Sequence, residues 1–377
     1  MLQSLHAGLV LGLAAALVGL DWVALAPNRL VPGQPLPASA ALGIGVFVIP
    51  GLVCAAEFAA WRRAPAAVPV CLVLAAVAAA LVGTGISAET LLQGRPSAAR
   101  VTLGSAFWIS LAALAVLALD HARGGPPWLM AATAAGLVAI AVGSMAPGLL
   151  DHLSLMVEYG RRREAVHDAV VQHIALAVGA LALAMVLVLP LGWAAFHRPR
   201  VEALADAALG AVQVTPSIAL FGLLIPLLAG LLSVAPSLRS FGLGAIGPAP
   251  AVIGAAIYIA LPLLRGLVGG LRAADPAAIE AARALGFSEA RTTLEIRIPL
   301  SLPILVGALR VAIVQSIGLV TLGGLIGAGG LGALVFEGMA QFAADLIVLG
   351  ALPIVGLALA ADLSLSALAR RLETAAS

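Results

Sequence analysis

Long apolar segments of about twenty residues, poor in charged side chains, recur along the whole chain. They lie at about 4–26, 38–60, 67–86, 101–119, 128–146, 168–192, 203–231, 250–270, 303–326 and 344–368. Because a helix needs roughly 20 apolar residues to cross the hydrocarbon core of a bilayer, this pattern predicts an all-α polytopic membrane protein with about ten transmembrane helices. The overlong segment 203–231 contains Pro216 and Pro226, which predict a kink or a tilt within it.

The composition excludes a soluble globular enzyme and several kinds of nucleotide chemistry. Apolar residues make up 62% of the 377 positions and charged residues only 10%, against roughly 45–50% and 25% in soluble proteins. All 20 basic residues are arginine, so the chain has no lysine for a P-loop, a Schiff base or a kinase site. Any ATP must therefore be hydrolysed by another subunit. The net charge of +2, without a basic stripe, argues against a nucleic-acid partner.

Two parts of the chain differ in the polarity of their apolar segments. Residues 1–146 are rich in Ala, Leu and Val, whereas the segments after about 165 also carry Gln, Ser, Thr and Pro. We therefore expect an N-terminal five-helix membrane extension at 1–146, a periplasmic connector at 147–167, a core at 168–370 and a cytoplasmic tail at 371–377. The first segment has an alternative interpretation as a cleaved signal peptide, since Ala24-Leu25-Ala26 resembles a cleavage site.

The arginines indicate the orientation of the chain in the membrane. Most of them fall in the loops that are cytoplasmic when the N-terminus is placed inside, as the positive-inside rule requires. Both termini are therefore expected in the cytoplasm. The run Arg161-Arg162-Arg163 violates the rule, and we interpret it as a solvated periplasmic stretch.

The longest predicted cytoplasmic loop, 271–302, carries the signals of two short helices. Asp275 can cap a helix whose first residue is Pro276, and Gly286 can end that helix in a left-handed conformation. A second helix can begin at Ser288 and must stop before Pro299. By pattern alone, the loop is either a surface hairpin without a partner or a pair of slim helices that dock into a groove on one.

The same loop carries a family resemblance. The residues Glu280-Ala281-Ala282, Gly286 and Ile296-Arg297-Ile298-Pro299 resemble the EAA loop of ABC importer permeases, with Ile298 where that pattern usually has Leu. The resemblance implies that 271–302, hereafter the EAA loop, forms coupling helices in the cleft of an ATP-binding subunit. It assigns this contact to Glu280, Ala281, Ala282, Gly286, Ile296 and Pro299.

The part of the chain from roughly 165 to 370 resembles a narrower group. The segments 213–220, 260–265, 326–332 and 350–353 are similar to the osmoprotectant permeases, the membrane subunits that import glycine betaine, choline, carnitine and related compounds. The five N-terminal helices would make this chain a long form of that family. The resemblance implies a type I importer core (MetI-like) in the bacterial inner membrane and a homodimer. It also implies ATP-binding cassette subunits and a periplasmic substrate-binding protein as partners, with ATP and Mg²⁺ held by the partner and no cofactor in this chain.

Polar residues within the predicted helices are the candidates for a translocation path. A quaternary ammonium zwitterion needs polar or π-rich groups along its way, since unpaired charge in hydrocarbon is costly. For any single residue, an ordinary hydrogen bond between helices is the commoner explanation, but the concentration of the group in the segments 203–231 and 303–326 favours a path lining. The candidates are Gln213, Thr215, Pro216, Ser217, Gln315, Ser316 and Thr321.

Four glycines after the segment 303–326 match the dinucleotide-binding pattern G-x-G-x-x-G. These are Gly327, Gly329, Gly330 and Gly332. A membrane helix precedes them and no βαβ unit surrounds them, so we interpret them as a sharp turn. The family resemblance implies that this turn lies beside the outer gate, and simple turn packing is the alternative. The six histidines show no metal-ligand spacing and are interpreted as ordinary interface residues.

Taken with the resemblance, the sequence predicts a transport subunit that is not itself an enzyme: the permease of an ATP-driven ABC importer for glycine betaine or a related quaternary amine. The alternative is a secondary transporter driven by an ion gradient. No internal repeat is apparent and no carboxylate is placed mid-span, and both observations disfavour that alternative. A third interpretation, a non-transporting scaffold, would make the polar residues packing devices only.

Overall fold

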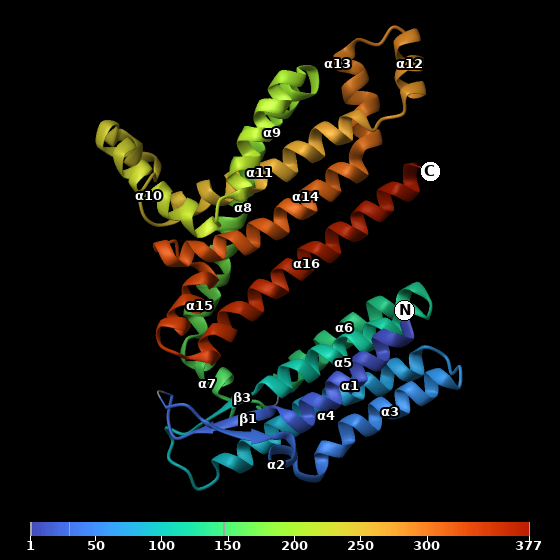
Figure 1. Cartoon of the computed structure of the whole chain (residues 1–377), viewed down its shortest axis with the longest axis vertical. Coiled ribbons are helices and arrows are strands. Elements are labelled where there is room, and N and C mark those ends of the chain that lie inside the picture. The colour runs from blue at the N-terminus through green and yellow to red at the C-terminus, as the bar shows by residue number, and fades with distance from the viewer. Residues whose placement is uncertain (1, 30, 146–147, 377) are drawn as a thin grey trace. The chain divides into compact units, whose positions relative to one another are not determined.

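The computed structural model describes residues 2–29, 31–145 and 148–376 (Figure 1). Positions 146 and 147, at the expected border between extension and connector, lie outside the described residues, as do Met1 and Ser377. The chain divides into two compact units, Met1–Arg161 and Arg162–Ser377.

The first unit is a helical bundle with a small sheet. Its elements are α1 (Leu2–Gly19), β1 (Asp21–Ala26), β2 (Gln34–Pro37), α2 (Ala38–Leu42), η1 (Gly43–Phe47), α3 (Val48–Trp61), α4 (Ala67–Leu92), β3 (Arg100–Leu103), α5 (Ser105–Arg123), α6 (Pro127–Met145) and α7 (Ser154–Arg161).

The sheet holds the helix ends of the first unit together. β1 lies between β2 and β3 and is antiparallel to both, with Val23 paired to Leu36 and Leu103. Trp22, which is fully buried, donates its indole N–H to Thr84 Oγ1 on α4 at 2.9 Å. The tryptophan therefore fixes the sheet to the bundle with its one polar group satisfied.

The sheet corrects the predicted bounds of two helices. The first helix ends at Gly19 instead of continuing to position 26, and α5 begins at Ser105 because 100–103 form β3. A short, mainly apolar segment has the same hydropathy in a strand as in a helix, and β1 finds its partner strands only through pairing with distant segments. The suggested cleavage site Ala24-Leu25-Ala26 lies in this central strand.

The second unit consists of helices only. They are α8 (Arg163–His197), α9 (Pro199–Val214), α10 (Ser217–Val234), η2 (Pro236–Phe241), α11 (Pro248–Arg272), α12 (Pro276–Ala284), α13 (Glu289–Thr292), η3 (Thr293–Arg297), α14 (Ile298–Val320), η4 (Thr321–Ile326), α15 (Gly330–Ala340) and α16 (Ala344–Ala376). The core lies where α11 packs between α8 and α14, and α14 packs in turn against α16.

The predicted helix 203–231 is two helices. α9 ends at Val214 and α10 begins at Ser217. Thr215 has an extended backbone (ψ 131°) because the ring of Pro216 disfavours the helical conformation of the residue before it. A break thus replaces the expected kink, while Pro226 lies inside α10 without ending it.

Nine helices in the described part of the chain are long and apolar enough to cross a membrane. The predicted all-α membrane class is confirmed, with the three-stranded sheet as an addition. Of the ten predicted segments, the first is shortened by β1, and the seventh contributes only α10 to the nine.

Candidate functional site

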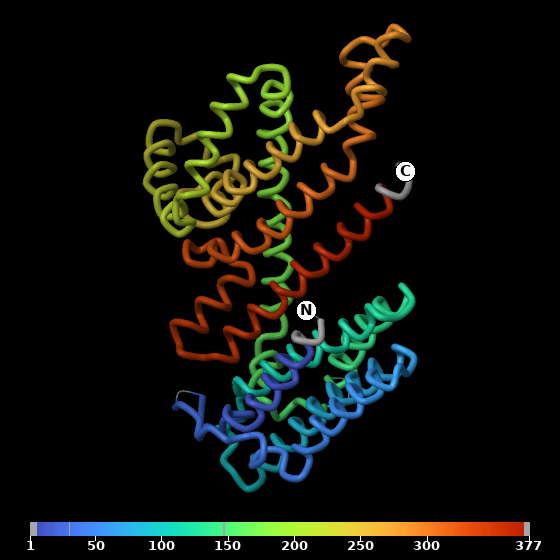
Figure 2. Tube along the Cα trace, turned by 45° about the vertical axis from the view of Figure 1, so that its right-hand side comes forward, coloured from blue at the N-terminus to red at the C-terminus, as the bar shows by residue number. Residues whose placement is uncertain are grey.

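The EAA loop projects from the second unit between α11 and α14 (Figures 1 and 2). The Asp275 carboxylate accepts a hydrogen bond from the backbone N–H of Ala277 at 2.9 Å, and Pro276 is the first residue of α12. Gly286 has φ +81°, a conformation that favours glycine, and Ser288 caps α13. The two short helices therefore form as the local signals predict.

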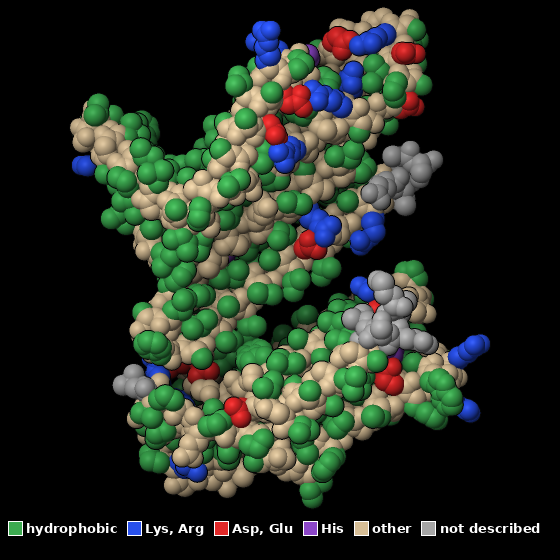
Figure 3. All heavy atoms as spheres, in the orientation of Figure 1, with side chains coloured by type: hydrophobic (Ala, Val, Ile, Leu, Met, Phe, Trp, Pro, Cys, Tyr) green, Lys and Arg blue, Asp and Glu red, His purple; other side chains and the backbone are tan. Residues whose placement is uncertain are grey.

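Ion pairs within the EAA loop fix α13 relative to α12. Arg283 on α12 contacts the Glu289 carboxylate on α13 at 2.7 Å, and Arg291 contacts Glu295 at 3.0 Å. The Arg291 guanidinium also lies over the Phe287 ring, 4.0 Å from its centroid. These charges gather at the exposed end of the second unit (Figure 3), where each pair contributes little by itself but several together restrict the loop.

The outer face of the EAA loop combines one unpaired carboxylate with apolar side chains. Ile279 and Ala282 are buried against the loop, whereas Glu280 and Ala281 are exposed. Among the described residues, the Glu280 side chain has no ion-pair or hydrogen-bond partner. Leu285 and Leu294 are 77% and 65% exposed. Of the remaining candidates, Ile296 is half-buried, while Gly286 and Pro299 are exposed.

The loop is joined to the helices on both sides of it. The Arg297 guanidinium donates to the carbonyl oxygen of Leu271 at 3.1 Å, and it lies over the Phe196 ring at the end of α8. Arg272, the last residue of α11, pairs with Glu202 on α9 at 2.6 Å. A displacement of the loop would therefore be carried to α8, α9 and α11.

The four path candidates between positions 213 and 217 lie at the break between α9 and α10. Gln213 donates its side-chain N–H to the carbonyl oxygen of Tyr258 on α11 at 2.6 Å, and the Tyr258 hydroxyl donates back to the carbonyl oxygen of Thr215. The break frees this carbonyl, so the tyrosine satisfies a group that the helix cannot. Pro216 is the N-cap of α10 and Ser217 its first residue.

The remaining candidates, on α14 and at the start of η4, differ in burial. Ser316 is buried and donates its hydroxyl to the carbonyl oxygen of Ala177 on α8 at 2.9 Å. Gln315 is exposed, and Thr321 is half-buried at the start of η4. Ser316 also lines a cavity of about 390 Å³ between α8, α14 and α16, together with His173 and Ser364. The structure thus separates the path candidates into two groups.

The glycines form a tight turn between η4 and α15. Gly327, Gly329 and Gly330 have φ of +77°, +77° and +68°. A Cβ on Gly332 would overlap the carbonyl oxygen of Thr321, so this glycine allows α15 to lie against η4. The conformation explains why glycine occupies these positions and leaves a gating role untested.

Gln172 on α8, which sequence reasoning did not identify, holds this turn. Its side-chain oxygen accepts from the backbone N–H of Gly330 at 2.9 Å, and its side-chain N–H donates to the carbonyl oxygen of Ala328 at 3.0 Å. Nothing in the local sequence indicates this role, because the turn lies about 156 residues further along the chain.

Sequence reasoning also did not identify the ion pairs between long helices. Arg265 on α11 contacts both carboxylate oxygens of Asp206 on α9, at 2.6 and 2.9 Å, and Arg310 on α14 contacts those of Asp362 on α16 at the same distances. The hydrogen bonds from Arg265 lower the pKa of Asp206 because they stabilise its charged form. Glu202 and Asp206 lie one turn apart on α9 and therefore on one face of it. This spacing is a signal that could have predicted an acidic helix face paired with arginines of another helix.

Arg162, in the run that violates the positive-inside rule, pairs with Glu337 on α15 at 2.8 Å. The residue joins the start of α8 to the C-terminal part of α15. Part of the interpreted solvated stretch is therefore engaged in a contact within the fold.

Two family profiles match the chain. The profile described as "Binding-protein-dependent transport system inner membrane component" matches residues 186–374, half of the chain. The profile described as "ABC transporter permease YehY, N-terminal domain" matches residues 3–156. The two matches fall on different units.

Several transport permeases are similar to about half of the chain. The carnitine transport permease protein OpuCB of Listeria monocytogenes is 31% identical over 201 residues, 53% of this chain and 85% of that protein. The osmoprotectant import permease protein OsmW of Salmonella typhimurium is 36% identical over 194 residues, 51% of this chain and 84% of that protein.

One solved structure, the inward-facing MetNI methionine ABC transporter in its CY5 native crystal form, superposes with a TM-score of 0.50 at 21% identity. It covers 56% of this chain and 98% of its own. At this level of identity the likeness shows the fold alone.

Proposed function

The chain belongs to the family of binding-protein-dependent transport system inner membrane components, and from this premise we propose that it imports glycine betaine or a related quaternary amine. It is the membrane-embedded permease subunit of an ABC importer, a multi-pass protein of the inner membrane with an N-terminal extension. The recognition made on the EAA loop is thereby confirmed. One observation carries the substrate proposal: the relatives that match about half of this chain are named as carnitine and osmoprotectant permeases.

ATP hydrolysis is proposed to take place in a separate ATP-binding cassette subunit that docks on the EAA loop. The support is the exposed part of the loop, which includes the Glu280 carboxylate, the small Ala281 and the apolar Leu285. The partner would hold ATP and Mg²⁺, since this chain has no lysine for a phosphate site. Closure of two such subunits around the loop would move α11 and α14, between which the loop lies.

The substrate is proposed to cross beside the break between α9 and α10 and along α14. The polar groups there are the backbone carbonyl of Thr215, the Tyr258 hydroxyl and the exposed amide of Gln315. We propose that a second copy of the chain faces Gln315 in a homodimer. A separate periplasmic binding protein would select the ligand and deliver it at the glycine turn, which would lie beside the outer gate. This arrangement requires both termini in the cytoplasm.

The test is betaine uptake by proteoliposomes that contain the chain with its ATP-binding subunit and a betaine-loaded binding protein. The wild-type protein should accumulate labelled betaine only with ATP inside. Glu280→Arg should insert into the membrane normally but lose ATP-driven uptake, because a repulsive charge replaces the docking carboxylate. The matched control is Glu89→Arg, the same charge reversal at an exposed position of α4.

Two outcomes would contradict the proposal. Normal uptake by the Glu280→Arg protein would remove the coupling role of this residue. Uptake that needs a sodium or proton gradient and proceeds without ATP would support the secondary-transporter alternative instead.

A further inference from the structure

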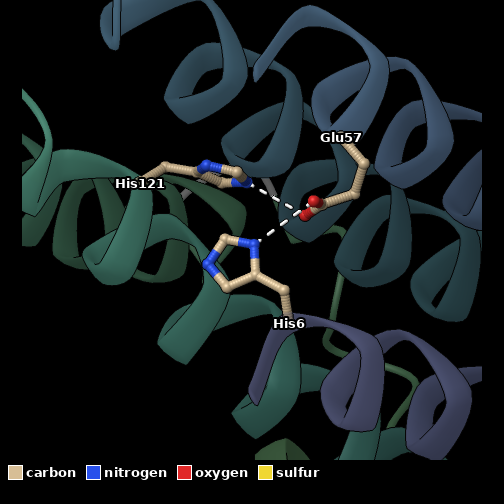
Figure 4. Close-up of side chains that lie close together, drawn as sticks. All are labelled: His6, Glu57 and His121. Atoms are coloured by element: carbon tan, nitrogen blue, oxygen red, sulfur yellow. Dashed lines mark hydrogen bonds and ion pairs between the residues drawn. The ribbon is translucent and has the colours of Figure 1, made fainter. Parts of the chain in front are cut away.

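Three helices of the first unit bring two histidines and a carboxylate to one point (Figure 4). His6 comes from α1, Glu57 from the last turns of α3 and His121 from the last turn of α5. His6 Nδ1 lies 3.2 Å from Glu57 Oε2, and His121 Nε2 lies 3.1 Å from Glu57 Oε1. One donor atom from each residue lies within 4.8 Å of the other two. Glu57 thus meets His6, which lies 51 positions before it in the sequence, and His121, which lies 64 positions after it.

The surroundings of the cluster are partly shielded from water. The side chains of His121 and Asp120 are 5% and 7% exposed, and those of His6 and Glu57 are 21% and 31% exposed. The two imidazole rings pack edge to face, with their centroids 4.8 Å apart. The cluster therefore has a buried side and one open side, from which an ion or a water molecule can enter.

If the His6 imidazole is neutral, it cannot donate a hydrogen bond to both of the carboxylate oxygens that its two nitrogens face. His6 Nε2 faces Asp120 Oδ2 at 2.6 Å, while Nδ1 faces Glu57 Oε2. A neutral imidazole carries one N–H and can donate to only one of these oxygens. The other nitrogen then presents a lone pair to a carboxylate oxygen 3.2 Å away. Either a second proton or a cation must lie between the two atoms.

The short contact to Asp120 indicates which nitrogen of His6 carries the proton. A hydrogen bond from Nε2–H to Asp120 leaves Nδ1 free as a ligand, the arrangement in which a carboxylate orients a metal-bound histidine. Arg123 in turn contacts Asp120 Oδ1 at 3.2 Å and fixes that carboxylate. The cluster thus has both a set of ligand atoms and a second layer that holds one of them.

We propose that His6 Nδ1, the Glu57 carboxylate and His121 Nε2 bind one divalent transition-metal ion of the zinc class. Two ligands held by one zinc ion at about 2.0–2.1 Å lie roughly 3.3 Å apart, and each imidazole nitrogen lies 3.1–3.2 Å from one oxygen of the Glu57 carboxylate. Two imidazoles disfavour Mg²⁺ and Ca²⁺, which prefer oxygen ligands. A water molecule takes the fourth position on the open side.

The ion ties α1 to α3 and α5, at the end of the unit where Arg62, Arg63 and Arg123 lie. α1 packs against the rest of the unit mainly through α5, with smaller contacts to α2 and the sheet. Metal binding near the start of α1 therefore adds a polar anchor to this helix. This role belongs to the extension and is independent of the proposed transport function.

The test uses the full chain, purified in detergent without a polyhistidine tag and stripped of metal. We expect one zinc ion per chain by elemental analysis after addition of Zn²⁺ and removal of the excess. Co²⁺, the spectroscopic substitute, should give the visible absorption of a tetrahedral site. His6→Ala and His121→Ala should abolish both signals, and Asp120→Asn should weaken zinc affinity about 10- to 100-fold. His152→Ala, at an exposed histidine of the same unit, is the matched control and should bind as the wild type does.

The wild-type measurement decides the proposal even if an alanine variant fails to fold. Absence of stoichiometric zinc on the wild-type chain would overturn it and would identify the cluster as a protonated His6 bridging two carboxylates. Zinc binding that survives in folded His121→Ala protein would also overturn it.

Discussion

At Gly332 the chain has no room for a side chain larger than hydrogen. The absence of a Cβ at this position sets how closely α15 can approach η4. A Cβ would meet the carbonyl oxygen of Thr321, which is backbone and cannot rotate away. Together with the positive φ of Gly327, Gly329 and Gly330, this contact makes the turn sensitive to every substitution. The dinucleotide-like spacing of the four glycines is thus a consequence of backbone geometry.

We predict that Gly332→Ala lowers the thermal unfolding midpoint of the purified protein by several degrees. The added methyl group must displace backbone, and overpacking of this kind costs about 1–3 kcal/mol. The control is Gly222→Ala on α10, where a Cβ has nothing within 4 Å and alanine favours the helix. An unchanged midpoint for Gly332→Ala would contradict the close approach.

The residues that shape the site illustrate what local sequence reveals. The caps at Asp275 and Ser288 and the left-handed Gly286 were predictable, because each acts on backbone groups within three residues or on its own φ. Gln172 was not, since its two partners lie on a turn that folding alone brings near it. The six histidines were interpreted as interface residues for the same reason. His6 and His121 lie too far apart in the sequence to show a metal-ligand spacing, and only the folded bundle brings them together.

At the scale of elements, ion pairs join helices that hydrophobic packing alone would leave free to slide. The Arg310 guanidinium binds both oxygens of Asp362 and so fixes the register of α14 against α16. In the sequence these two charges lie in separate apolar segments, and each looks like an isolated charged residue in an otherwise apolar helix. Their pairing explains why both are tolerated there, because each neutralises the other.

We predict that Asp362→Asn and Arg310→Ala each lower the thermal midpoint, and that the exchanged pair Arg310→Asp with Asp362→Arg recovers part of the loss. A single substitution leaves one charge without its partner, whereas the exchange restores opposite charges on the two helices. The measurement is thermal unfolding of the three proteins in the same detergent. A double variant less stable than both single variants would show that the pair does not act as a unit.

At the scale of the whole molecule, the two units have separate hydrophobic cores. The core of the first unit draws on residues between Leu13 and Leu153, and those of the second on residues between Leu176 and Ala328. The carnitine permease OpuCB is matched over 85% of its length by 201 residues of this chain. That relative therefore has little length left for an extension of this kind.

We predict that a chain beginning at Arg162 still inserts into the membrane and supports betaine uptake with the same partners. Its cores and the EAA loop are complete without the first unit. The measurement is ATP-driven uptake in proteoliposomes at equal amounts of full-length and shortened protein. Loss of uptake by a shortened protein that is correctly inserted would assign the extension an essential part in transport.

The sequence by itself determined the membrane class, the approximate position of most spans, the two helices of the EAA loop and the family. Each of these depends on properties carried within a short window: hydropathy over about twenty residues, a cap and its neighbours, or a contiguous motif. The tertiary structure alone decided that residues 21–26 form a strand and that Gln172 holds the glycine turn. It also brought His6, Glu57 and His121 together. These features depend on pairing between residues far apart in the chain, and a hydrophobic pattern is the same whichever distant partner a segment finds.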